Sequence, residues 1–196
     1  WPEGDARPDV RIYTIRHIDI EAGEVDIDFV MHEGAAMPGA RFARDARPGD
    51  RVGMTGPGGG SAGDADWYLL AGDETALPAI ARILAGMPAD RHAIVRIEVG
   101  GSLDEQPLPS AAKVDLKWLH RGAAEPGATT LLEDAVRAVE WPLAGTRVFT
   151  WAGCEHRSFR AIRTYLRQER RLKRDEHLAV AYWRRGASGD EARKED

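Results

Sequence analysis

The spacing of apolar residues divides the chain into two regions. In residues 66–186, short apolar runs alternate with segments whose apolar residues recur every three or four positions. The first kind of segment is typical of buried strands, and the second of helices with one buried face. The expected strands are 67–71, 93–99, 114–119, 146–151 and 178–183, and the expected helices are 75–85, 129–139 and 158–169. This alternation predicts a doubly wound, mostly parallel α/β sheet.

The first sixty residues show polar and apolar alternation interrupted by turn signals, which indicates antiparallel β structure. Strands are expected at 10–16, 25–32 and 51–55, and a short helix at 38–46 with proline near its first turn. The glycine-rich stretch 56–64 lacks the Lys-Ser or Lys-Thr of a phosphate loop and is interpreted as a linker. We therefore predict domains at 1–63 and 64–186, and a polar, disordered tail at 187–196.

Composition excludes several functional classes. The 196 residues carry a net charge of −5, which disfavours nucleic acid as the main partner. A single cysteine excludes an internal disulfide and fits the reducing cytoplasm. No apolar run approaches the roughly 18 residues of a membrane span, and Trp1-Pro2-Glu3-Gly4 does not resemble a signal peptide. We expect a soluble cytoplasmic protein without membrane insertion.

The segment Arg11-Ile12-Tyr13-Thr14-Ile15-Arg16 has the residue types that suit a flavin. The guanidinium of Arg11 can bind a pyrophosphate with two parallel hydrogen bonds, and the ring of Tyr13 can lie against an isoalloxazine. The hydroxyl of Thr14 can hydrogen-bond a ring nitrogen of the cofactor. The same short pattern also occurs in ordinary edge strands, so both interpretations remain open at this point.

Acidic residues follow the first strand of the predicted α/β sheet, at Gly72-Asp73-Glu74. Ligands of such sheets bind beyond the carboxyl ends of the strands. Asp73 is expected to cap the following helix, and Glu74 to occupy the favourable first turn. Two carboxylates here would repel a phosphate, so any nucleotide contact is expected to be weak or displaced.

The segment Cys154-Glu155-His156 follows another strand and resembles a catalytic or metal cluster at first sight. It offers too few ligands for zinc or iron, so no metal site is predicted. A Cys–His nucleophilic pair is disfavoured because adjacent side chains on a strand or helix point apart.

The last predicted helix is strongly basic. Five arginines fall at helical spacing: Arg160, Arg163, Arg167, Arg171 and Arg174. Such a stripe is usually a solvated face, and in an acidic protein it can also bind an anionic partner or substrate. Both interpretations stay open.

The motifs together, in this order, closely resemble siderophore-interacting proteins. The resemblance spans residues 10–186 and is carried by Arg11-x-Tyr13-Thr14-x-Arg16, 26–32, 38–43, Pro48-Gly49-Asp50, 56–59, 67–80, Trp151-Ala152-Gly153, 160–166 and Tyr182-Trp183-Arg184-x-Gly186. It implies a ferredoxin-reductase-like flavoprotein with an FAD-binding β-barrel followed by an α/β domain. Family members have further strands before the Arg11 motif, so a partial barrel is expected here.

The resemblance also implies an activity: reduction of a ferric siderophore in the cytoplasm, with electrons from NAD(P)H or a reduced ferredoxin. Thr14 would lie at the reactive edge of the flavin. The implied FAD-binding residues are Arg11, Tyr13, Thr14, His32, Pro38, Gly39, Ala40 and Arg41. The implied electron-donor site comprises Gly72, Asp73, Thr75, Gly153 and Glu155, and the implied substrate residues are Trp183 and Arg184.

Two alternatives remain. One is a general NAD(P)H:flavin or ferredoxin-type oxidoreductase, although the acidic Asp73-Glu74 pair counts against tight NADP binding. The other is a flavin-free module that binds a partner or the chelate.

Overall fold

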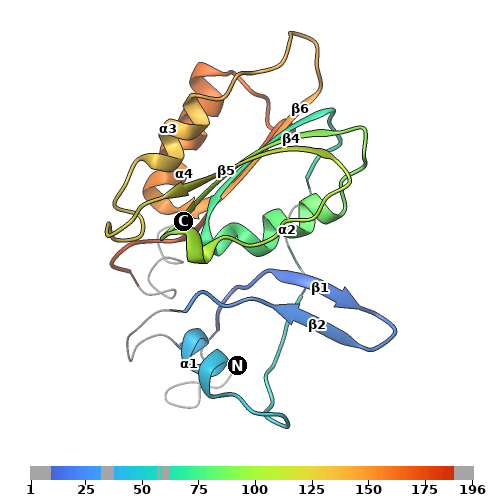
Figure 1. The fold of residues 1–196 in the computed structure, drawn as a ribbon, viewed down its shortest axis with the longest axis vertical. Coiled ribbons are helices and arrows are strands. Elements are labelled where there is room, and N and C mark those ends of the chain that lie inside the picture. Colours follow the sequence, from blue (N-terminus) through green and yellow to red (C-terminus); the bar gives the residue numbers. More distant parts are fainter. Residues whose placement is uncertain (1–9, 32–37, 57, 59–61, 188–196) are drawn as a thin grey trace. The chain divides into compact units, whose positions relative to one another are not determined.

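The computed structural model describes residues 10–31, 38–56, 58 and 62–187. The chain divides into two compact units, residues 1–59 and 60–196, which are shown in Figure 1. Each unit is described by itself. Of the predicted tail, residues 188–196 lie outside the described part of the chain.

The first unit contains an antiparallel strand pair and one helix. Strands β1 (Ile15–Asp19) and β2 (Glu24–Ile27) are joined by a turn in which Gly23 has a φ of 68°. Helix α1 (Pro38–Asp45) begins at the expected proline. The predicted helix at 38–46 is therefore confirmed.

Three strand predictions in this unit are wrong in part or whole. The first strand begins at Ile15, not at residue 10, the second ends at Ile27, and residues 51–55 form no strand. The pairing of β1 with β2 ends at Ile15 opposite Ile27. Alternation alone does not make a strand, because the backbone also needs a partner to pair with.

The second unit is built on five parallel strands. They are β3 (Trp67–Asp73), β4 (His92–Val99), β5 (Lys113–His120), β6 (Val148–Glu155) and β7 (His177–Trp183), in the order β5-β4-β3-β6-β7. All four neighbouring pairs are parallel. The predicted fold class, antiparallel β structure followed by a doubly wound parallel sheet, is confirmed.

Helices cover both faces of this sheet (Figure 1). Helix α2 (Leu77–Ala85) packs on one face, and α3 (Leu131–Arg137) and α4 (His156–Thr164) pack on the other. Two short 3₁₀ turns, η2 (Glu74–Ala76) and η3 (Ser102–Asp104), follow β3 and β4. Within the described residues, no helix has both the length and the apolar character that crossing a membrane requires.

Several boundaries differ from the prediction: α2 begins at Leu77 and not at residue 75, α3 spans Leu131–Arg137 and not 129–139, and β6 begins at Val148 and not at residue 146. Strand β6 continues through Glu155, whereas the sequence predicts its end at residue 151. The helix predicted at 158–169 begins earlier, at His156, and changes at Tyr165 into a π-helical turn, η4 (Tyr165–Glu169). Parallel pairing with β3 and β7 extends β6 despite its glycine.

Strand β3 is buried along its whole length and supplies both cores. Tyr68 and Leu70 belong to the core under α2, while Leu69 and Ala71 belong to the core under α3 and α4. This alternation within one apolar run is what a central strand covered on both faces requires.

The end of the predicted linker is fixed to the second unit. The Tyr68 hydroxyl donates to the Gly63 carbonyl (3.0 Å) and accepts from the Ala65 N–H (2.9 Å). Arg147 binds Asp64 (2.8 Å) and Asp66 (2.6 Å). A domain boundary after residue 63 stays a prediction.

Gly72 lies where β3 meets the turn that follows it. It pairs with Gly153 of β6, and a Cβ atom at this position would lie 2.3 Å from the Ala76 Cβ and 2.7 Å from the Gly153 oxygen. Only glycine lets η2 and β6 approach the end of β3 this closely.

We therefore expect Gly72→Ala to destabilise the protein, because an added methyl group overpacks this junction at a cost of about 1–3 kcal/mol. Urea unfolding followed by circular dichroism measures the loss. Gly101→Ala is the matched control, because a Cβ there meets nothing within 4 Å. Equal stability of the two variants would contradict the packing argument.

Candidate functional site

Tyr13 of the predicted flavin motif lies in a small aromatic cluster. Its ring centroid is 4.6 Å from that of Phe29, and the residue keeps 39% of its surface exposed. Partial burial raises the pKa of the Tyr13 hydroxyl, and the charge of Arg11 opposes this rise. One side of the ring is therefore packed while an accessible aromatic surface remains.

The structure brings Tyr13 against the first turn of α1. A Cβ at Gly39 would lie 1.7 Å from the Tyr13 hydroxyl oxygen, so only glycine fits beneath the ring. The first turn of α1 carries no acidic residue, so no carboxylate of that turn opposes the attraction of the positive helix end for an anion.

The other predicted flavin residues have varied surroundings. Arg11 and Thr14 are half-buried, Ala40 is buried, and Arg41 is exposed. Arg11 also donates to the Val10 carbonyl (2.8 Å). The predicted residue His32 lies outside the described residues.

In the second unit, the carboxylate of Asp73 joins three strand ends. It accepts hydrogen bonds from the Thr75 N–H (3.0 Å) and hydroxyl (2.5 Å), the Glu155 N–H (3.0 Å) and the Trp183 indole Nε1–H (2.8 Å). Burial raises the pKa of Asp73, while the bonds from Thr75 and Trp183 lower it. Its expected role as a cap of the following turn is confirmed.

Glu155 is the second organising carboxylate of this sheet edge. One oxygen accepts from the Arg157 N–H (2.5 Å), which caps α4, and the other accepts from the Arg185 N–H (3.1 Å). Gly127, with a φ of 69°, lies against Glu155 and Trp183, where a Cβ would come within 2.8 Å and 3.1 Å of their side chains. The segment expected to be a loop, Gly153 to Glu155, is therefore the end of a strand and buried.

Polar partners that the sequence analysis missed surround these residues. Arg121, which follows β5, forms a two-pronged ion pair with Glu74. Glu98 on β4 accepts a hydrogen bond from Thr129 (2.9 Å), and burial raises its pKa. Glu98 stands near the carboxyl end of a predicted strand, and this signal could have revealed it.

The ion pair between Arg121 and Glu74 changes the expectation that the carboxylates of Asp73 and Glu74 both repel a nucleotide. Asp73 is enclosed by its own donors, and Arg121 balances the charge of Glu74. The acidic pair is therefore a weaker barrier to a phosphate than the sequence suggests.

The sulfur of Cys154 is buried in the core under α3 and α4. Burial raises the pKa of the Cys154 thiol, which keeps it protonated and poorly nucleophilic. Among the described residues, no group of three or more His, Cys, Asp or Glu side chains could hold a metal ion.

Comparison with known proteins covers both units. Residues 65–186 match the family described as "Siderophore-interacting protein", and residues 1–61 match the "Siderophore-interacting FAD-binding domain". This chain belongs to the siderophore-interacting protein family. The ferric vibriobactin reductase ViuB of Vibrio cholerae is 36% identical over 188 residues, which are 95% of this chain and 68% of that protein.

Two solved structures of this family are similar in fold. A siderophore utilization protein from T. fusca is 41% identical with a TM-score of 0.82, over 91% of this chain and 67% of the other. The siderophore-interacting protein SipS from Aeromonas hydrophila is 34% identical with a TM-score of 0.86, over 98% of this chain and 75% of the other.

The described residues fit the FAD that the family's first domain binds. Tyr13 offers an aromatic surface, Arg11 offers a cation two residues away, and Gly39 lets the helix start pack against the hydroxyl end of the ring. These are the groups that an isoalloxazine and a pyrophosphate require.

We expect Asp73→Asn to lower the free energy of unfolding by about 1–3 kcal/mol, because an amide nitrogen cannot accept and at least one buried N–H loses its partner. Urea unfolding at pH 7.5 measures the loss. A change in Trp183 fluorescence is expected with it, since Trp183 Nε1–H donates to Asp73.

Glu98→Gln is the matched control, because the amide oxygen still accepts from Thr129. The pKa values of Asp73 and Glu98 are both raised, so removing the charge favours both variants near pH 7.5; only Asp73→Asn also loses an acceptor, and Glu98→Gln is therefore expected to be neutral or stabilising. This gain vanishes near pH 4, where the wild-type carboxyl is already protonated. A similar loss of unfolding free energy in Asp73→Asn and Glu98→Gln at pH 7.5 would refute the different roles of the two carboxylates.

Proposed function

We propose that this protein is an FAD-dependent oxidoreductase that reduces a ferric siderophore to its Fe(II) form and so releases iron in the cytoplasm. The observation that carries the proposal is the family match over both units, the first of which matches an FAD-binding domain. The name of the relative ViuB, a ferric vibriobactin reductase, gives further support.

In this proposal the first unit holds the flavin. Arg11 binds the pyrophosphate, Tyr13 packs on the isoalloxazine, and Thr14 lies at its reactive edge. The residues Pro38, Gly39, Ala40 and Arg41 cover the cofactor, together with His32. The contact between Tyr13 and the start of α1 supports this arrangement, because it places the aromatic surface beside the positive end of a helix dipole.

The chemistry that FAD would supply when bound is electron transfer from the donor, whether a two-electron or a one-electron carrier, to the one-electron acceptor Fe(III). The donor in this proposal is NAD(P)H or a reduced ferredoxin. Gly72, Asp73, Thr75, Gly153 and Glu155 form its site. The pairing of Glu74 with Arg121 supports access by a phosphate-bearing donor.

The substrate residues in this proposal follow the end of β7. Trp183 is held by the Asp73 carboxylate, and Arg184 is exposed beside it. A guanidinium attracts an anionic chelate and raises its local concentration. After one electron arrives, hard oxygen ligands hold the resulting Fe(II) weakly, and the metal leaves.

We expect purified protein to take up FAD and to show a flavin spectrum. Stopped-flow mixing with NADH, NADPH or reduced ferredoxin should bleach the flavin, and a ferric siderophore should restore its colour while a ferrous chelator reports Fe(II). Protein that cannot take up FAD would refute the proposal. Flavin that is reduced but passes no electrons to ferric chelates would indicate a general flavin oxidoreductase instead.

Arg184→Ala is expected to raise the KM for an anionic ferric siderophore by about tenfold, since a charge-assisted contact contributes about 1.5 kcal/mol or more. FAD affinity should not change. Steady-state kinetics with anionic and neutral chelates measure the effect.

Lys117→Ala removes the same charge from the opposite edge strand, β5, where Lys117 is exposed, and serves as the control. Equal KM values for Arg184→Ala and the wild type would exclude the substrate role of Arg184.

A further inference from the structure

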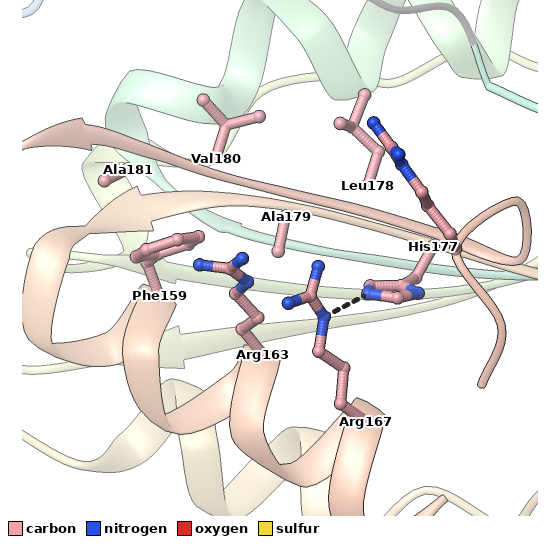
Figure 2. Close-up of a pocket in the computed structure, with 9 residues that line it drawn as sticks. Phe159, Arg163, Arg167, His177, Leu178, Ala179, Val180 and Ala181 are labelled. Carbon is pink, nitrogen blue, oxygen red and sulfur yellow. Dashed lines mark hydrogen bonds between the residues drawn. The ribbon is translucent and has the colours of Figure 1, made fainter. Parts of the chain in front are cut away.

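A cavity of about 410 Å³ lies between α4, its π-helical continuation η4 and the edge strand β7 (Figure 2). Its volume is in the range of small-molecule sites. The lining residues are Phe159, Arg163, Arg167, Arg174, His177 and the first residues of β7 that follow it. The basic stripe seen in the sequence thus has a structural counterpart, although Arg160 and Arg171 do not line the cavity.

Three guanidinium groups line this cavity without a carboxylate partner among the described residues. Arg163, Arg167 and Arg174 form none of the ion pairs found in that part of the chain. In contrast, the nearby Arg137 binds Glu169 (2.7 Å). Three permanent positive charges around one cavity in an acidic chain favour a multiply charged anion.

Two of these guanidinium groups are held in place. Arg167 donates from Nε to His177 Nε2 (3.1 Å), and His177 Nδ1 lies 2.7 Å from the Lys173 carbonyl. This geometry assigns the neutral tautomer with the proton on Nδ1, so the buried imidazole acts as an acceptor for Arg167. The Arg163 guanidinium lies over the Phe159 ring at 5.6 Å. Figure 2 shows both arginines reaching from the helix toward β7.

The backbone at Arg167 is unusual in a way that supports a binding role. Arg167 lies in the π-helical turn η4, where the Arg170 N–H bonds the Tyr165 carbonyl. Such turns are rare and are frequent at functional sites. The held orientation of Arg167 leaves both terminal nitrogens of its guanidinium for a ligand.

The cavity is separate from the residues of the proposed function. It lies beside His177 at the start of β7, whereas Trp183 ends the same strand. The cavity extends along β7 to Ala181, two residues or about 7 Å from Trp183, while its His177 end, where Arg167 is held, lies about 20 Å from Trp183. The cavity lining shares no residue with the proposed donor and siderophore sites, and a ligand held by Arg167 lies at the far end of the strand from Trp183.

We propose that this cavity is a binding site for a small anion with two or more phosphate or carboxylate groups. Arg163 and Arg167, one helical turn apart, each bind one charged group with two parallel hydrogen bonds. Arg174 adds a third charge, and the apolar side chains of β7 contact the ligand's carbon or bridging atoms.

Isothermal titration calorimetry on the full chain saturated with FAD tests the proposal, with inorganic pyrophosphate and citrate as probes at constant ionic strength. Saturation with FAD keeps pyrophosphate from the flavin site. We expect one of the two probes to bind, and the double variant Arg163→Ala/Arg167→Ala to weaken its binding by about a hundredfold, or tenfold per arginine. Pyrophosphate binding would indicate a phosphorylated ligand, and citrate binding a polycarboxylate.

Arg160→Ala is the matched control, because it removes an exposed arginine of the same helix that does not line the cavity. Arg167→Lys keeps the positive charge and loses the two parallel hydrogen bonds of the guanidinium, so its affinity for the probe should lie between those of the wild type and the double variant. Binding that survives in the double variant, or no binding of either probe, would overturn the proposal. Binding of an acidic peptide alone, lost in the double variant, would also overturn it in favour of a protein partner.

Discussion

The second unit depends on one buried carboxylate. Asp73 ends the central strand and receives hydrogen bonds from the turn that follows, from the end of β6 and from the end of β7. Strand β3 leads through α2 to β4 on one side, whereas its other neighbour, β6, leads through α4 to β7 on the other side, and the two helices cover opposite faces of the sheet. Crevices open where the connections reverse direction in this way. Asp73 thus sets the geometry of the place where ligands of such sheets bind.

The charges of this unit are sorted along its strands. Asp73, Glu98 and Glu155 are buried at the carboxyl ends of the strands, where backbone N–H groups, hydroxyls and an indole donate hydrogen bonds to them. The guanidinium groups of Arg163, Arg167 and Arg174 gather around the start of β7 instead. An overall charge of −5 therefore conceals a local positive site.

The sequence predicts the parallel sheet well because the central strand β3 is a compact apolar run and the edge strand β5 alternates polar and apolar residues, and both patterns are typical of strands. The prediction from sequence is wrong where strand pairing, and not local composition, determines where a strand begins or ends. β1 begins only where β2 can pair with it, and β6 continues through Gly153 because Gly72 lies opposite. The ion pair of Arg121 with Glu74 joins residues 47 positions apart, and the π-helical turn depends on tertiary packing. Neither the ion pair nor the π-helical turn produces a recognisable pattern in the neighbouring sequence.

Burial of Cys154 has a chemical consequence for a protein that would release ferrous iron. Fe(II) readily generates reactive oxygen species, and exposed thiolates are oxidised stepwise to sulfenic and sulfinic acids. The single thiol of this chain is covered by the core and held in its protonated form. Cys154 therefore offers the released metal no thiolate ligand, and it is not a thiolate that the product of the proposed reaction could oxidise.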